Sequence, residues 1–156
     1  LVVYELLLRD FLAAHDYATL LDTLDYLQGL GVTAIEIMPI NETNTIQSLI
    51  DALNYFYEKT KNDITLEYIL FKDKNDSQQD AEELIKIYRK IPTHLINVIE
   101  YNPVAGTDFM KPNEERTEAF TGILAKNRVN VRVRRSRGKD IDAACGQLAN
   151  KDKIPA

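Results

Sequence analysis

The chain has 156 residues, the usual length of one domain and enough to bury a single core. Its composition, 45% hydrophobic and 28% charged, excludes a disordered chain, a collagen and a low-complexity tract. No run of about 18 apolar residues is present, so the sequence predicts no membrane-spanning helix and no membrane partner. The N-terminus lacks the pattern of a signal peptide. Because it starts at Leu1, we expect a piece of a longer reading frame or an engineered chain.

Two strands, with a helix between them, are predicted in the first part of the chain. Residues 2–8 and 32–38 are largely apolar and partly β-branched, as buried strands are. Apolar residues recur at helical spacing over 17–27, and glycines follow that segment. Thr45 then has the position of an N-cap, ahead of a second amphipathic helix.

Three further strands are predicted at residues 64–71, 95–101 and 129–133, with helices between them. Asp76 or Ser77 is placed to cap the first of these helices, and Pro112 to occupy the first turn of the next. In the last strand, valines alternate with asparagine and arginine, which predicts one apolar and one cationic face. Asp140 can cap a final short helix that runs through Leu148.

Five strands that alternate with five helices predict an α/β fold of five βα units with a mainly parallel sheet. We expect a single domain over residues 1–156, either an open sheet or a partial TIM-like barrel, because a closed barrel needs eight units. Its open sheet edges would allow self-association. Sites in such folds lie at the carboxyl ends of the strands, which are residues 41–44, 72–76, 102–107 and 136–139.

Charge and cysteine content narrow the function further. The net charge is −5, yet residues 126–139 hold seven Lys or Arg and no acidic residue, which favours a polyanion contact at one place. Cys145 is the single cysteine, so neither an internal disulfide nor a multi-cysteine metal site is possible, and a cytoplasmic location is expected. His15 and His94 have no ligand spacing and are predicted to be structural or exposed.

Two resemblances to known families cover different parts of the chain. Residues 1–42, with YELLLRDF and GVTAIEIMPINE, resemble the first βαβ unit of the alpha-amylase family of glycoside hydrolases. Residues 38–151 resemble the C-terminal half of the RlmN/Cfr-type radical-SAM 23S rRNA adenine-C2 methyltransferases, which also act on tRNA. The second resemblance rests on ITLEYILFKDKNDS, YNP and VRVRRSRGKDIDAACGQLA. The two meet at MPINE, residues 38–42, so our hypothesis is a chimera.

The methyltransferase resemblance implies roles for particular residues. It makes Cys145 the catalytic residue that carries the methyl group, and a thiolate suits that chemistry. It makes Asn102 a contact of S-adenosylmethionine. It makes rRNA or tRNA the partner of a set of basic residues: Arg132, Arg134, Arg135, Arg137 and Lys139. The alternatives are a small buried cysteine, an Asn-Pro turn and a solvated cationic face.

Other parts of the family pattern are missing. The family holds a 4Fe-4S cluster on three cysteines after the first strand, and one cysteine cannot supply three thiolates. We therefore expect no cluster, weak or no binding of S-adenosylmethionine, and no methyl transfer by this chain alone. The alternative is a non-catalytic or engineered α/β scaffold. An amylase remnant is a weaker alternative, because its acid and base carboxylates cannot be placed.

Overall fold

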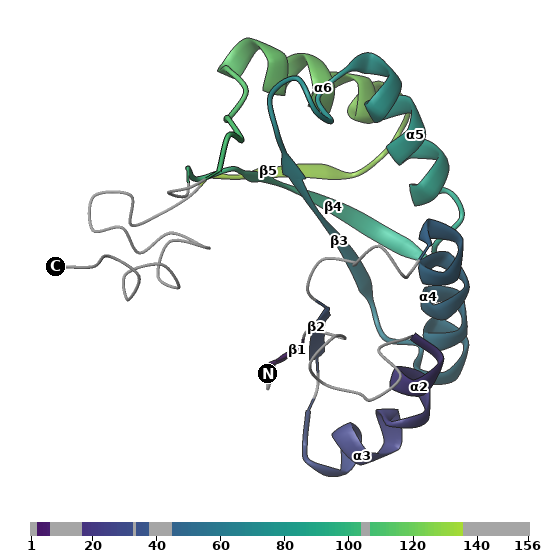
Figure 1. Ribbon diagram of the computed structural model, residues 1–156. Helices are drawn as coiled ribbons and strands as arrows, with labels where there is room; N and C mark the ends of the chain where they lie inside the picture. Colours follow the sequence, from purple (N-terminus) through teal and green to yellow (C-terminus); the bar gives the residue numbers. More distant parts are fainter. Residues whose placement is uncertain (1–2, 7–16, 33, 38–44, 104–106, 136–156) are drawn as a thin grey trace, which may run out of the picture. The chain divides into compact units, whose positions relative to one another are not determined.

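The computed structural model describes residues 3–6, 17–32, 34–37, 45–103 and 107–135 (Figure 1). The chain divides into two compact units, Leu1–Asn62 and Asp63–Ala156, and each is described by itself. The predicted single domain stays a prediction.

In the part of the first unit that the structure describes, there are a parallel strand pair and three helices. Strand β1 (Val3–Leu6) pairs with β2 (Ala34–Ile37), and the helices are α2 (Tyr17–Asp22), α3 (Leu24–Gly29) and α4 (Ile46–Thr60). The sequence predicted one helix where α2 and α3 stand. The two are separated at Thr23, whose hydroxyl donates to the carbonyl of Leu20 at 2.8 Å and so competes with the regular backbone bonds.

Helix α4 begins where the sequence predicted. The side chain of Thr45 accepts a hydrogen bond from the amide of Ser48 at 3.1 Å, which confirms its N-cap role. Among the described residues of this unit, Tyr17, Leu20 and Leu27 form a buried core cluster.

The described residues of the second unit form a parallel three-stranded sheet with two helices. Strands β3 (Ile64–Leu70), β4 (Thr93–Glu100) and β5 (Val131–Arg134) lie in the order β3-β4-β5. Helices α5 (Gln78–Tyr88) and α6 (Glu114–Lys126) lie on one side of this sheet (Figure 1). The α/β class and the parallel strands are confirmed, and this open sheet is consistent with a partial TIM-like barrel.

The core of the second unit lies between its sheet and its helices. Every second residue of a strand faces the helices, and the largest fully buried side chains of this core are Leu70, Ile96, Val98, Phe120 and Leu124. Val129, just before β5, belongs to this core and the partly buried Val131 packs against it, whereas Val133 is 40% exposed. The predicted apolar face of the last strand is therefore covered only at its start.

The structure shows which residues cap the two helices of the second unit. Ser77 caps α5 in a reciprocal capping box with Asp80, so Ser77 and not Asp76 has this role. Asn113 caps α6, which places Pro112 before the cap. The predicted first-turn position of Pro112 is thus wrong, because the asparagine side chain can accept the amide of Arg116 and the helix starts after it. The predicted helix from Asp140 lies outside the described residues.

Candidate functional site

The carboxyl edge of the β3-β4-β5 sheet brings two of the predicted site segments together. Leu70 and Glu100 are register partners at the ends of β3 and β4, so the residues after them emerge at the same edge. Asn102 lies there and is only 5% exposed. The predicted segments 41–44 and 136–139 lie outside the described residues.

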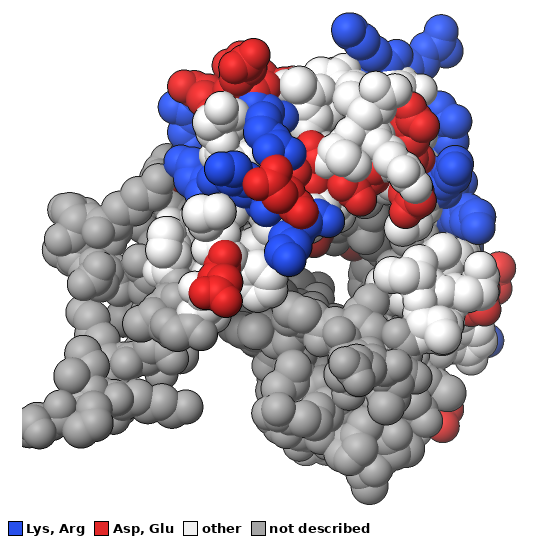
Figure 2. Space-filling view, turned by 45° about the horizontal axis from the view of Figure 1, so that its top comes forward, with Lys and Arg blue, Asp and Glu red and all other residues white. Residues whose placement is uncertain are grey.

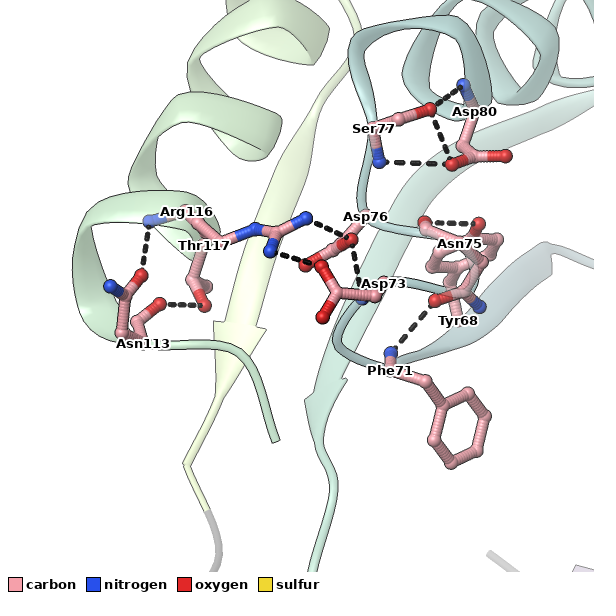
Figure 3. A network of polar contacts seen from close by, with 10 residues as sticks. All are labelled: Tyr68, Phe71, Asp73, Asn75, Asp76, Ser77, Asp80, Asn113, Arg116 and Thr117. Atoms are coloured by element: carbon pink, nitrogen blue, oxygen red, sulfur yellow. Dashed lines mark hydrogen bonds and ion pairs between the residues drawn. The ribbon is translucent and has the colours of Figure 1, made fainter. Parts of the chain in front are cut away.

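The loop after β3 is closed by one asparagine (Figure 3). The Asn75 Oδ1 accepts from the amide of Phe71 at 2.7 Å, and its Nδ2 donates to the carbonyl of Ile69 at 2.9 Å. The hydroxyl of Tyr68 donates to the carbonyl of Asn75 at 3.0 Å. Burial, reinforced by Asp80, raises the pKa of Tyr68 to about 12. This loop therefore has a fixed shape at the edge of the sheet.

Arg116 ties the same loop to the first turn of α6 (Figure 3). Its guanidinium donates to Asp73 and, at 2.7 Å, to Asp76 Oδ1, which also accepts the amide of Asp73 at 2.9 Å. The side chain of Asp76 is 1% exposed, so this ion pair is buried on the aspartate side. The hydrogen bond from Arg116 lowers the pKa of Asp73, and the same bond raises the pKa of Arg116. The contact fixes the loop relative to α6.

An aromatic cluster stands at the same edge and was not predicted from the sequence. Phe71 has its ring centroid 4.9 Å from that of Tyr101 and 4.7 Å from that of Phe109. The amide of Lys72 donates to the carbonyl of Met110 at 2.8 Å, which holds the segment after β4 against the end of β3.

The cationic side of β5 is balanced in part by acidic neighbours. Arg134 Nη1 lies 3.2 Å from Oε2 of Glu67, whose Oε1 also accepts from the side-chain amide of Asn97 at 2.7 Å. Arg135 Nη2 lies 2.7 Å from Oε1 of Glu114. Among the described residues, Arg132 forms no ion pair. Figure 2 shows Lys and Arg interspersed with Asp and Glu over the coloured part of one face.

A cavity of about 470 Å³ lies between α6 and the carboxyl ends of β4 and β5. Two ion pairs line this cavity, one between Lys111 and Glu100 and one between Arg135 and Glu114. The side chain of Thr117 also lines it. Its size is in the range of small-molecule sites.

The residues present fit the two family cofactors differently. Asn102, which the methyltransferase resemblance makes a contact of S-adenosylmethionine, is buried at the strand ends, and its side-chain amide carries both donor and acceptor groups. An iron–sulfur cluster does not fit, because the chain has one cysteine and the described residues hold no group of three His, Cys, Asp or Glu placed for a metal. Cys145, Arg137 and Lys139 lie outside the described residues. No described helix has the length and hydropathy to cross a bilayer.

Curated proteins similar to this chain include several RlmN-type RNA methyltransferases, although no family model matches. The probable dual-specificity RNA methyltransferase RlmN of Christiangramia forsetii is 49% identical over 116 residues, which are 74% of this chain and 33% of that protein. The same enzyme of Cytophaga hutchinsonii is 49% identical over 116 residues, 74% of this chain and 32% of that protein. That of Salinibacter ruber is 46% identical over 121 residues, 76% of this chain and 32% of that protein.

Three quarters of the chain is similar to a third of an RlmN methyltransferase. The crystal structure of a radical SAM methyltransferase from Sphaerobacter thermophilus matches with a TM-score of 0.65 and 39% identity, over 70% of this chain and 32% of that one. A domain of pyruvate-formate lyase-activating enzyme from Bacteroides vulgatus matches with a TM-score of 0.50 and 12% identity, over 76% of this chain and 91% of that one, which supports the fold alone. None of these comparisons tests the amylase-like segment or the chimera, which stay predictions.

Sequence reasoning missed the acidic partners of the arginines. Glu67 lies in the predicted strand 64–71 on the face opposite the core, and strand alternation alone places it there. Its pairing with Arg134 was not foreseen, because the two residues are far apart in sequence and meet only through the register of three strands.

Proposed function

We propose that this chain supplies the carboxyl part of the barrel of an RlmN-type radical-SAM RNA methyltransferase. The observation that carries the proposal is the 49% identity over 116 residues to an RlmN enzyme. A parallel sheet whose carboxyl edge holds the buried Asn102 supports it. The chain spans about a third of the length of its curated relatives, so the activity and substrates of the whole enzyme come to it only as a proposal.

Asn102 and Cys145 have the chemical roles in this proposal. Asn102 binds S-adenosylmethionine through its amide oxygen and nitrogen, in a position screened from water. Cys145 accepts the methyl group on its sulfur, and S-adenosylmethionine supplies that group when bound. With one cysteine the chain lacks the thiolates for a cluster, so we expect no methyl transfer to RNA without further protein.

In this proposal, the basic residues of β5 and of the segment after it bind RNA. Arg132 and Arg134 lie on the face of the sheet opposite α5 and α6, and Glu67 holds the guanidinium of Arg134 in place. Arg135 is held by Glu114 in the same way. These ion pairs are exposed, so they cost little to exchange for phosphate. Arg137 and Lys139 complete the set. The partners are rRNA and tRNA, and the location is the cytoplasm.

Salt dependence of RNA binding tests this contact. In the variant with Arg134, Arg135 and Arg137 changed to Gln, affinity for a labelled single-stranded RNA should fall. The slope of log K against log salt should flatten by up to about two, the value for three single-strand phosphate contacts. A matched variant with Lys86, Arg89 and Lys90 changed to Gln has the same net charge and should keep the slope. An unchanged slope in the first variant would place the RNA contact elsewhere.

If the chain is a non-catalytic scaffold, the opposite result is expected in the RNA-binding experiment. A scaffold without a ligand would bind neither RNA nor S-adenosylmethionine, and all three chains would behave alike. A loss confined to the variant of the β5 arginines would reject it.

A further inference from the structure

The aromatic cluster at the carboxyl edge is built from three separate segments of the second unit. Phe71 follows β3, Tyr101 follows β4, and Phe109 belongs to the segment before α6. The Tyr101 and Phe109 rings stand edge to face at 83°, with centroids 6.4 Å apart. The Tyr101 hydroxyl shares a hydrogen bond of 2.8 Å with the hydroxyl of Thr107. The rings are therefore held in fixed orientations.

This cluster is not part of the core. None of its rings belongs to the buried residues between the sheet and the helices. Phe109 is 46% exposed and the adjacent Met110 is 54% exposed, although aromatic rings usually gain by burial. A prearranged set of rings with one exposed member and two half-buried ones, beside the buried Asn102, is the kind of arrangement found in ligand sites.

The segments that carry the rings hold both lysines and acidic residues, and the charges without an ion pair among the described residues are two lysines and one aspartate. Lys72 follows Phe71, Lys111 lies two residues after Phe109, and Lys74 belongs to the same loop as Lys72. Among the described residues Lys72 and Lys74 form no ion pair, whereas Lys111 pairs with Glu100. Of the nearby acids, Asp73 is already engaged by Arg116, which leaves Asp108 as an exposed carboxylate beside the cluster. A ligand with a flat ring and a negatively charged backbone fits this combination.

We propose that Phe71, Tyr101 and Phe109 form a platform on which an unpaired nucleobase stacks. Every base has a π-face, so stacking on aromatic side chains needs no particular sequence, and flanking lysines attract the phosphates. The inference deepens the proposed function and rests on it, since a base at this edge comes either from RNA or from the adenine of S-adenosylmethionine. Both sources present the same flat ring.

A single tryptophan makes the site directly observable, because the chain contains no other. In the variant Phe109→Trp, indole emission should be quenched when an unpaired oligoadenylate of about six nucleotides binds. The matched control is Tyr55→Trp. Tyr55 is also exposed, at 44%, and has a lysine over its ring, Lys59, but it lies on α4. The control should show no quenching.

A second variant measures how much the stacking contributes. Phe71→Leu keeps an apolar side chain and removes the ring, and labelled oligoadenylate should bind about 5- to 150-fold more weakly, the range for one stacked base. Far-UV circular dichroism checks that the variants fold. Titration of the Phe109→Trp variant with S-adenosylmethionine identifies the source of the base. Quenching by oligoadenylate assigns the base to the RNA substrate. Quenching by S-adenosylmethionine alone assigns it to the cofactor.

Two results would overturn the platform. One is a Phe109→Trp chain whose emission is unchanged at millimolar oligoadenylate and millimolar S-adenosylmethionine. The other is a Phe71→Leu chain that binds both as the unmodified chain does. If the arginine variant described above still flattens the salt slope in that case, the RNA contact on β5 stands and only the platform is wrong.

Discussion

Removing the buried carboxylate of Asp76 should strongly lower the free energy of unfolding of the second unit. The side chain is 1% exposed, and its Oδ1 accepts one hydrogen bond from the amide of Asp73 and one from Arg116. Asp76→Ala leaves that amide without its acceptor and separates the loop after β3 from α6. Both bonds are made to a charged carboxylate, and a hydrogen bond to a charged group contributes about 1.5–3 kcal/mol, so we expect a loss of about 3–6 kcal/mol.

Urea unfolding followed by far-UV circular dichroism measures this loss. The comparison variant is Asp73→Ala, which removes the exposed carboxylate on the same guanidinium. It should have a much smaller effect, because exposed ion pairs contribute little. Equal losses in the two variants, or an Asp76→Ala chain within about 0.5 kcal/mol of the parent, would show that the buried contact does not hold the loop.

Three further predictions concern the same unit. Phe120→Ala removes the ring stacked on Tyr68 in the centre of the core and should cost about 3–5 kcal/mol in urea unfolding; a cost below about 1 kcal/mol would contradict the core. Ser77→Ala removes the capping box of α5 and should cost about 1 kcal/mol, with faster amide exchange confined to the first turn of that helix. The Tyr68 pKa of about 12 lies above the unfolded value of 10, so the neutral phenol stabilises the fold and stability should fall between pH 10 and 12. A titration at the phenolate absorbance band, with Tyr68→Phe as control, checks this, and a Tyr68 that ionises at pH 10 would refute it.

Local signals in the sequence predicted the start of α4 and narrowed the start of α5 to Asp76 or Ser77. Thr45 and Ser77 cap their helices through contacts three residues away, which a sequence displays directly. The prediction from Pro112 was wrong because proline is equally compatible with a position before the cap. The side chain of the adjacent Asn113 accepts the amide of Arg116 and so caps the helix. The break at Thr23 depends on one hydroxyl that bonds back to Leu20, which helical periodicity does not reveal.

The site was predictable in position but not in its contacts. Strand alternation and parallel topology place Asn102 at the carboxyl edge, as expected. The pairing of Glu67 with Arg134 and the meeting of Phe71 with Phe109 depend on register and on a loop that returns to the sheet. Contacts of that kind join residues that are distant in sequence, so periodicity and capping rules carry no information about them.

The most direct test of the proposed function is methyl transfer by a grafted enzyme. Residues 38–151 of the chain, which include Asn102 and Cys145, would replace the corresponding part of the Christiangramia forsetii relative. The account predicts that the graft methylates RNA and that the same graft with Cys145→Ala does not. A folded graft that is inactive with Cys145 in place, or active without it, would contradict the account.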